Sequence, residues 1–112
     1  AVAVTESWNG TAWTEVGDLN TGRKGLTGSG AGLNTAALCF GGAPTSAITE
    51  LWNGTAWTEV ADLSTAREGL AGSGTSASAL GAGGTPTSPQ SALVATEEWT
   101  DPILVTRSAD TD

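Results

Sequence analysis

The sequence predicts an all-β fold made of repeated antiparallel sheets, and three observations carry this prediction. Residues 5–19 (TESWNGTAWTEVGDL) and 49–63 (TELWNGTAWTEVADL) are near-copies, identical at 13 of 15 positions. Each copy places an Asn-Gly pair between runs rich in Thr, Val and Trp, which is typical of β-hairpins. Gly or Pro interrupts almost every window of helical length, so no helix of useful length is expected.

The repeat continues along the chain with a nearly constant period. Trp8 and Trp52 lie 44 positions apart, and a third Thr-Glu-x-Trp motif, Thr-Glu-Glu-Trp, ends at Trp99, 47 positions after Trp52. A period of this length is typical of a four-stranded propeller blade. The predicted organisation is therefore about two and a half blades: a half blade over 1–19, a full blade over 20–63 and a second blade over 64–112.

Each predicted strand is supported by its own sequence. In the half blade, AVAVTESW pairs with TAWTEV through a two-residue type I′ turn at Asn9-Gly10. The innermost strands are made of small residues, because Gly, Ala and Ser permit close approach at a crowded ring axis. The remaining strands are expected at 24–32, 34–42, 46–53 and 55–63, then at 69–77, 79–84 and 91–99, with an atypical last strand at 103–110.

These motifs resemble the kelch repeat. Its pattern is a hydrophobic strand ending in Gly-Gly, then a strand with an aromatic residue, then a Trp, and here it is carried by Gly41, Gly42, Gly83 and Gly84 with Trp52, Trp99, Trp13 and Trp57. The resemblance implies antiparallel four-stranded blades of a β-propeller. The tandem copies are also similar to repeats in predicted tail or fibre proteins of marine bacteriophages. Two departures are that Trp52 and Trp99 stand where many kelch blades carry Tyr, and that 81–84 lacks bulky residues.

The amino-acid composition excludes most kinds of catalytic, metal-binding and nucleic-acid-binding site. The 112 residues contain 4 Lys and Arg against 12 Asp and Glu, for a net charge of -8, which argues against nucleic-acid and anionic-membrane partners. With no His and one Cys there is no Ser-His or Cys-His dyad, no His metal ligand and no internal disulfide. The copper chemistry that some kelch propellers carry needs Tyr and His, and the chain has neither. No catalytic residue, metal or cofactor is expected.

The tryptophans recur at fixed positions of the repeat, as core residues must. Stacking on sugar rings is the competing interpretation. We expect structural packing between blades for Trp8, Trp13, Trp52 and Trp57. Trp99 is the best candidate for ligand binding, because the motif around it has drifted.

The arginines Arg23 and Arg67 occupy the same repeat position, beside a small-residue strand. A structural role predicts that each pairs with Asp18 or Asp62, or with a turn carbonyl. A functional role predicts that they face the ring channel and meet an anionic ligand. The structural role is preferred, and both arginines stay candidate binding residues.

Other polar residues carry weaker signals. Glu6, Glu50 and Glu97 each follow a Thr, and paired carboxylates serve glycosidases. Repetition favours a structural role, since a catalytic pair is usually unique in a ring. Cys39 lies in an apolar run and is expected to be a buried small hydrophobe.

The predicted function is a non-enzymatic binding or structural module. The leading hypothesis is a virion component, such as a phage tail or fibre, or another extracellular surface protein. Its rim loops (20–24, 43–47, 64–68 and 85–91) would contact a host glycan or protein. The alternatives are a purely structural ring- or fibre-forming repeat protein and, less favoured, a cytoplasmic kelch-type interaction scaffold. About two and a half blades leave open strand edges, so the ring is expected to be completed by identical chains in a cyclic homo-oligomer or by the rest of a longer chain.

Overall fold

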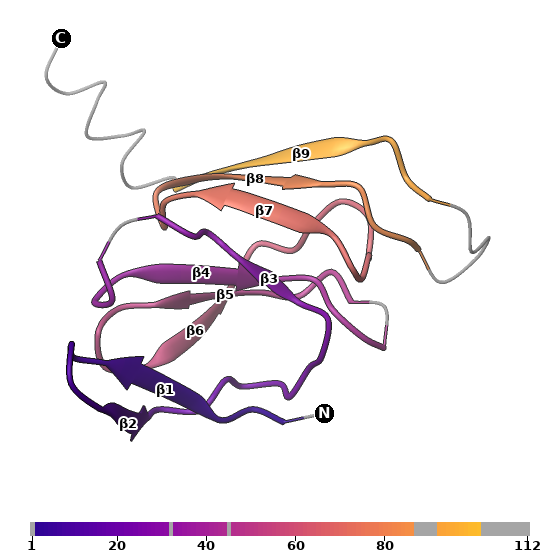
Figure 1. Cartoon of the computed structure of the whole chain (residues 1–112). Helices are drawn as coiled ribbons and strands as arrows, with labels where there is room; N and C mark the ends of the chain where they lie inside the picture. The colour runs from indigo at the N-terminus through magenta and orange to yellow at the C-terminus, as the bar shows by residue number, and fades with distance from the viewer. Residues whose placement is uncertain (1, 32, 45, 87–91, 102–112) are drawn as a thin grey trace, which may run out of the picture.

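The structure is a computed structural model, which describes residues 2–31, 33–44, 46–86 and 92–101. All of its regular elements are β-strands (Figure 1). They are β1 (Thr5–Trp8), β2 (Trp13–Val16), β3 (Thr27–Gly28), β4 (Ala37–Phe40), β5 (Thr49–Trp52), β6 (Trp57–Val60), β7 (Ala71–Gly74), β8 (Ser78–Ala82) and β9 (Thr96–Thr100). The all-β prediction is confirmed for these residues, and none of them belongs to a helix long and apolar enough to cross a membrane.

The strands form three antiparallel sheets in chain order. The first sheet is β1-β2, the second is β3-β4-β5-β6 and the third is β7-β8-β9, and within each sheet the strands that follow one another in sequence pair. They fall within 1–19, 20–63 and 64–112 respectively. The strands are shorter than the predicted runs: the small-residue strand expected at 24–32 is regular only over Thr27–Gly28. The strand predicted at 103–110 lies outside the described residues.

The two Asn-Gly segments close hairpins, but the predicted turn type is wrong. Trp8 pairs with Trp13, so the loop has four residues rather than two. Gly10 has a φ of 98°, whereas no non-glycine residue among those described has a positive φ, as a type I′ turn would require of Asn9. The Asn9 Oδ1 instead accepts hydrogen bonds from the backbone N–H groups of Thr11 and Ala12 at 2.8 and 2.9 Å. Side-chain capping of this kind explains the Asn without a type I′ turn.

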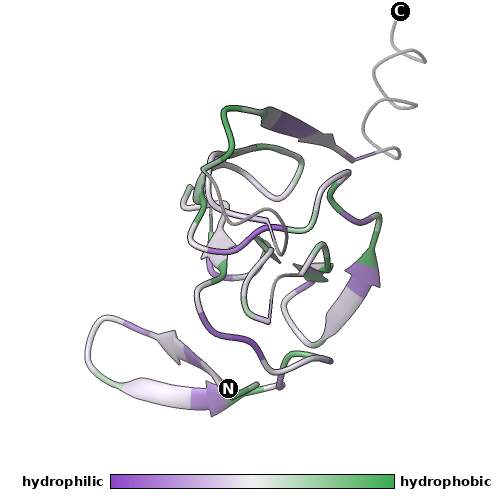
Figure 2. Ribbon diagram, turned by 90° about the vertical axis from the view of Figure 1, so that its right-hand side faces the viewer, coloured by the Kyte–Doolittle hydropathy of each residue, from purple (hydrophilic) through white to green (hydrophobic). Residues whose placement is uncertain are grey.

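The sheets follow one another across the molecule, with the first at the bottom and the third at the top of Figure 1. In the rotated view of Figure 2, the first hairpin stands to one side of the rest. The main core lies between the second and third sheets, where Leu38, Phe40, Leu70 and Ala79 are buried. Trp99 is partly buried against this core.

Small residues allow β3 and β7 to approach each other closely. Hydrogen bonds join the segments around β3 and β7, from Ala31 N to Gly74 O at 2.9 Å and from Gly69 N to Gly25 O at 3.1 Å. A Cβ on Gly72 would lie 2.7 Å from the Gly28 carbonyl oxygen and 2.9 Å from the Phe40 ring. A side chain there would force the two sheets apart.

The two Gly-Gly pairs are required by the backbone. Gly41, Gly42, Gly83 and Gly84 all have positive φ, between 73° and 115°. A Cβ on Gly84 would also lie 2.6 Å from the carbonyl oxygen of Glu68. The Gly-Gly ends of β4 and β8 thus turn the chain where the linker between sheets crosses it.

Candidate functional site

The most conspicuous polar site is a buried ion pair in the second sheet. Arg23 and Glu50 are 3% and 0% exposed, and their Nη2 and Oε2 atoms lie 3.0 Å apart. The backbone N–H of Asn20 donates to Glu50 Oε1 at 2.7 Å, and that of Thr21 donates to Oε2 at 3.3 Å. Arg23 Nη1 donates to the carbonyl oxygens of Gly41 and Ile48 at 2.9 and 2.6 Å. We call this arrangement the arginine–glutamate clamp.

The third sheet repeats the main contacts of the clamp. Arg67 Nη2 lies 2.8 Å from Glu97 Oε2, and Arg67 is 1% exposed. Its Nη1 donates to the carbonyl oxygens of Gly83 and Ala95, the counterparts of Gly41 and Ile48. The backbone N–H groups of Ser64 and Thr65 donate to the two Glu97 oxygens at 2.5 and 3.1 Å. Each clamp therefore ties the linker that enters a sheet to two strands of that sheet, β4 and β5 in the second sheet and β8 and β9 in the third.

The clamp corrects one prediction about the arginines. Their acidic partners are Glu50 and Glu97, not Asp18 or Asp62. The predicted contact with backbone carbonyls is present in both cases. Because both guanidinium groups are buried and their Nη atoms bind carboxylate and carbonyl oxygens, they are poorly placed to meet an anionic ligand from solvent.

The clamp controls the ionisation of Glu97. Partial burial opposes the charged form, but the backbone N–H groups of Ser64 and Thr65 and the charge of Arg67 outweigh that effect and lower the pKa of Glu97 below its usual 4.5. Glu97 is therefore a permanent anion at neutral pH, which suits a structural ion pair better than a general acid.

Cys39 is buried behind the first clamp, as expected of a small hydrophobe. The Arg23 Nη2 lies 3.4 Å from its Sγ. Burial raises the pKa of the Cys39 thiol to about 11, although the nearby Arg23 charge opposes the rise. A protonated, buried thiol is a poor nucleophile.

The tryptophans form two equivalent pairs. The rings of Trp52 and Trp57 have centroids 5.4 Å apart at 47°, and those of Trp8 and Trp13 have centroids 5.4 Å apart at 46°. Their surroundings differ greatly. Trp52 is 7% exposed, whereas Trp8 is 46% and Trp13 64% exposed.

The second pair packs against the first sheet. Trp57 Nε1 donates to Thr5 Oγ1 at 3.2 Å, and Trp52 Nε1 donates to the Asn34 carbonyl at 3.1 Å. Packing between sheets, expected for all four, thus holds for Trp52 and Trp57. Trp8 and Trp13 line one cavity with Trp52 and Trp57, yet they are exposed in the described structure, so their part in packing between sheets stays a prediction.

Trp99, the tryptophan singled out for ligand binding, is half-buried. It packs against the core between the second and third sheets and donates its indole N–H to the Ser76 carbonyl at 3.0 Å. Its position is equivalent to that of Trp52, so its surroundings resemble those of a structural residue. The most exposed aromatic surface in the described part of the chain is Trp8 with Trp13, for which the sequence predicted packing.

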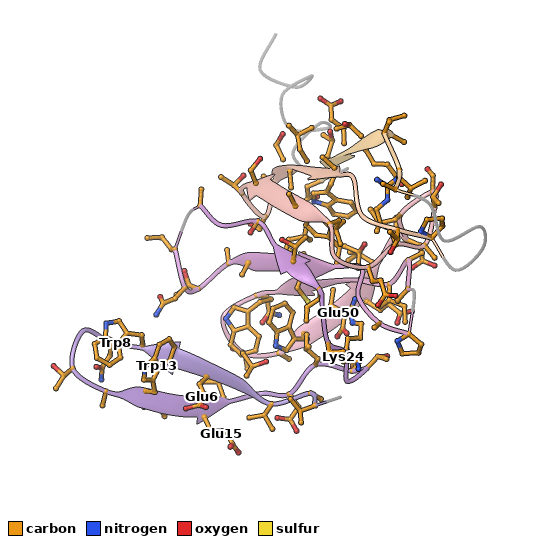
Figure 3. All side chains as sticks on the ribbon, turned by 45° about the vertical axis from the view of Figure 1, so that its right-hand side comes forward. Glu6, Trp8, Trp13, Glu15, Lys24 and Glu50 are labelled. Carbon is orange, nitrogen blue, oxygen red and sulfur yellow. The ribbon has the colours of Figure 1, made fainter. Side chains whose placement is uncertain are left out.

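Glu6 is the third member of the Glu50 and Glu97 series, and it lacks a clamp. Its side chain is exposed, and no arginine or linker amide among the described residues binds its carboxylate. Figure 3 shows Glu6 and Glu15 with Trp8 and Trp13 on the first hairpin, whereas Glu50 lies within the second sheet. We call the surface made by Glu6, Trp8, Trp13 and Glu15 the open hairpin face.

The predicted rim loops meet at one end of the sheets. Ala43 N donates to the Lys24 carbonyl at 2.6 Å, and Glu68 bridges Thr85 through hydrogen bonds of 3.0 and 3.1 Å. The linker and Gly-Gly loops are therefore side by side there, with Lys24 exposed. Residues 87–91 of the last loop lie outside the described part.

Among the described residues, no group of three or more Cys, Asp or Glu side chains is arranged to hold a metal ion. No protein-family model and no curated protein matches this chain. The function proposed below therefore depends on the internal repeat and its geometry.

Proposed function

We propose that the chain is a non-enzymatic β-propeller module of the kelch type, in which each sheet is a blade and further repeats complete the ring. The observation that carries the proposal is the repeated clamp: Arg23–Glu50 and Arg67–Glu97 perform the same task in successive sheets. Units that repeat the same internal contacts along a chain are typical of architectures built by stacking.

A binding role fits the loops better than the repeated residues. The clamps occupy the recurring arginines, and packing occupies Trp52, Trp57 and Trp99. The loops around Lys24 and Ala43 form a contiguous rim. We place contact with a host glycan or surface protein on this rim, in a virion tail, fibre or other extracellular setting.

The alternative is a purely structural ring- or fibre-forming module. This alternative is supported by the same observation, that the recurring Trp and Arg side chains make structural contacts within the chain. A glycan array separates the two, since the binding hypothesis expects selective signal that is lost when rim residue Lys24 is replaced by Glu. Absence of any selective signal would favour the structural module.

Association tests the propeller itself. An incomplete ring exposes strand edges, so we expect the isolated chain to associate at low micromolar concentration. Analytical sedimentation measures this directly. A folded 11.1 kDa monomer that melts cooperatively would contradict the proposed need for further repeats.

A further inference from the structure

We infer that the open hairpin face is a docking site for the inner strand pair of a further repeat of this same kind, which supplies an arginine to Glu6. This docking site rests on the proposed function, and it identifies the partner of one surface. The chain holds three equivalent glutamate positions, and two of them are occupied.

The Glu6 carboxylate is the first part of the docking site. Glu50 and Glu97 each bind one arginine and two consecutive backbone N–H groups of a linker. Glu6 stands at the same place in the same Thr-Glu-x-Trp strand, with the same register to its hairpin partner. Its clamp position is open in the described structure. The ligand that fits is a guanidinium carried by a linker with free amides, rather than a bare cation.

The outer edge of β1 is the second part. In the second sheet β5 pairs with β4 on one edge and β6 on the other, and in the third sheet β9 pairs with β8. β1 pairs with β2 alone among the described strands. Its other edge matches the edge of β5 that binds the Gly-Gly strand, so an extended inner strand can be added there by main-chain hydrogen bonds.

The exposed aromatic pair is the third part. Trp8 and Trp13 reproduce the centroid distance and tilt of Trp52 and Trp57, yet Trp8 is 46% exposed where Trp52 is 7% exposed. The Trp52 indole donates to a carbonyl of the loop between its own inner strands, Asn34. An inner strand pair beside β1 would give Trp8 the same acceptor and cover its ring.

A folded second copy of the chain lacks a free inner strand of this type. β4 is bonded by β3 and β5, and β8 by β7 and β9, so both edges of each are occupied. Arg23 and Arg67 are likewise held in their own clamps. The fitting partner is thus a repeat whose Gly-Gly strand, the counterpart of β4 and β8, still has an open edge.

The test uses the full chain and a synthetic peptide of residues 64–86, which contains the linker, Arg67 and the β7 and β8 sequences. We expect saturable binding with a blue shift of tryptophan emission and weaker acrylamide quenching. Glu6→Gln in the chain, or Arg67→Ala in the peptide, should weaken binding about tenfold or more, as loss of one partner of a buried charge pair does. Glu15→Gln, on the same face without a clamp, is the matched control.

A tethered version removes the cost of ordering a free peptide. Residues 64–85 joined ahead of residue 2 should raise Tm by about 5 °C or more. Glu6→Gln should cancel much of that gain while changing the untethered chain little. Equal effects of Glu6→Gln in both chains, or no gain and no peptide binding, would overturn the inference.

Sedimentation separates this inference from the proposed function. A discrete homo-oligomer that Glu6→Gln dissociates would assign the face to a second copy and overturn the inference, while leaving the propeller proposal standing. Conversely, a stable folded monomer that binds the peptide would support the docking site and contradict the expected association of the chain.

Discussion

Trp57 in the second sheet donates its indole N–H to the hydroxyl of Thr5 in the first, a hydrogen bond of 3.2 Å between residues 52 positions apart. It links two sheets that share no strand pairing. The two sheets are thus held together by side chains at equivalent positions of the repeat. A residue at such a position stabilises the fold more when a neighbouring sheet covers it than when it is exposed.

Replacing Trp57 by Ala should therefore lower the free energy of unfolding by about 3 kcal/mol, the low end for a large aromatic because the ring is half-buried. Trp13→Ala is the matched control, since Trp13 holds the same position at 64% exposure. It should cost about 1 kcal/mol, the worth of its aromatic pairing with Trp8. Urea unfolding measures both values, and equal losses would contradict the difference in packing.

Leucines at equivalent positions give a second matched comparison. Leu38 is 1% exposed between the second and third sheets, whereas Leu80 is 43% exposed on the outer side of the third. Leu38→Ala should destabilise the chain by about 2–5 kcal/mol. Leu80→Ala should cost less than about 1 kcal/mol, as surface substitutions usually do. A large loss for Leu80→Ala would mean that another surface covers it in solution.

The close approach of the inner strands predicts that Gly72→Ala is harmful. The added methyl group would meet the Gly28 carbonyl oxygen and the Phe40 ring within 3 Å. Overpacking of this kind costs about 1–3 kcal/mol. Ser73→Ala, on the exposed side of the same strand, should be nearly neutral. Thermal melts of the two variants check this, and an unchanged Tm for Gly72→Ala would contradict the close spacing of β3 and β7.

The repeat made the fold predictable because identical hairpin sequences take identical registers. The pairing of Thr5 with Val16 is repeated in that of Thr49 with Val60. The turn type was not predictable from Asn-Gly alone, since the Asn9 side chain caps the loop and lets four residues close it.

The clamp partners could not be chosen from local spacing. Arg23 and Glu50 are 27 positions apart in the sequence. They meet because the folded sheet brings the linker before β3 close to β5. A signal did exist, because an Arg and a Thr-Glu pair recur together in the second and third repeats. The exposure of Trp8 and Trp13 could not be predicted from the sequence either. Their motif is identical to that of Trp52 and Trp57, and only the neighbouring sheet differs.

The acid limb of stability should depend on Glu97. Its pKa is lower in the folded chain than the usual 4.5, so the unfolded chain binds more protons in the acid range. The stabilisation is fully present above that usual value and is lost as the pH falls through the folded pKa. Glu97→Gln should flatten the fall of unfolding free energy below about pH 4.5. Glu98→Gln, exposed on the same strand, should keep the parental slope, and an unchanged slope for Glu97→Gln would contradict the clamp's effect on ionisation.

Arg67→Lys tests whether the clamp needs a guanidinium or only a positive charge. Arg67 Nη1 donates to the Gly83 and Ala95 carbonyls while Nη2 binds Glu97, which spreads three contacts over a planar fork. A lysine ammonium is a compact donor on a flexible stem and cannot occupy both nitrogen positions. At least one buried carbonyl would lose its partner, at a cost of about 1–3 kcal/mol, with more lost from the weaker ion pair. Lys24→Arg, an exposed exchange in the reverse direction, should leave the unfolding free energy unchanged. If Arg67→Lys were as stable as the parent in urea, charge alone would hold the linker to Glu97, and the carbonyl contacts would add nothing to the free energy of unfolding.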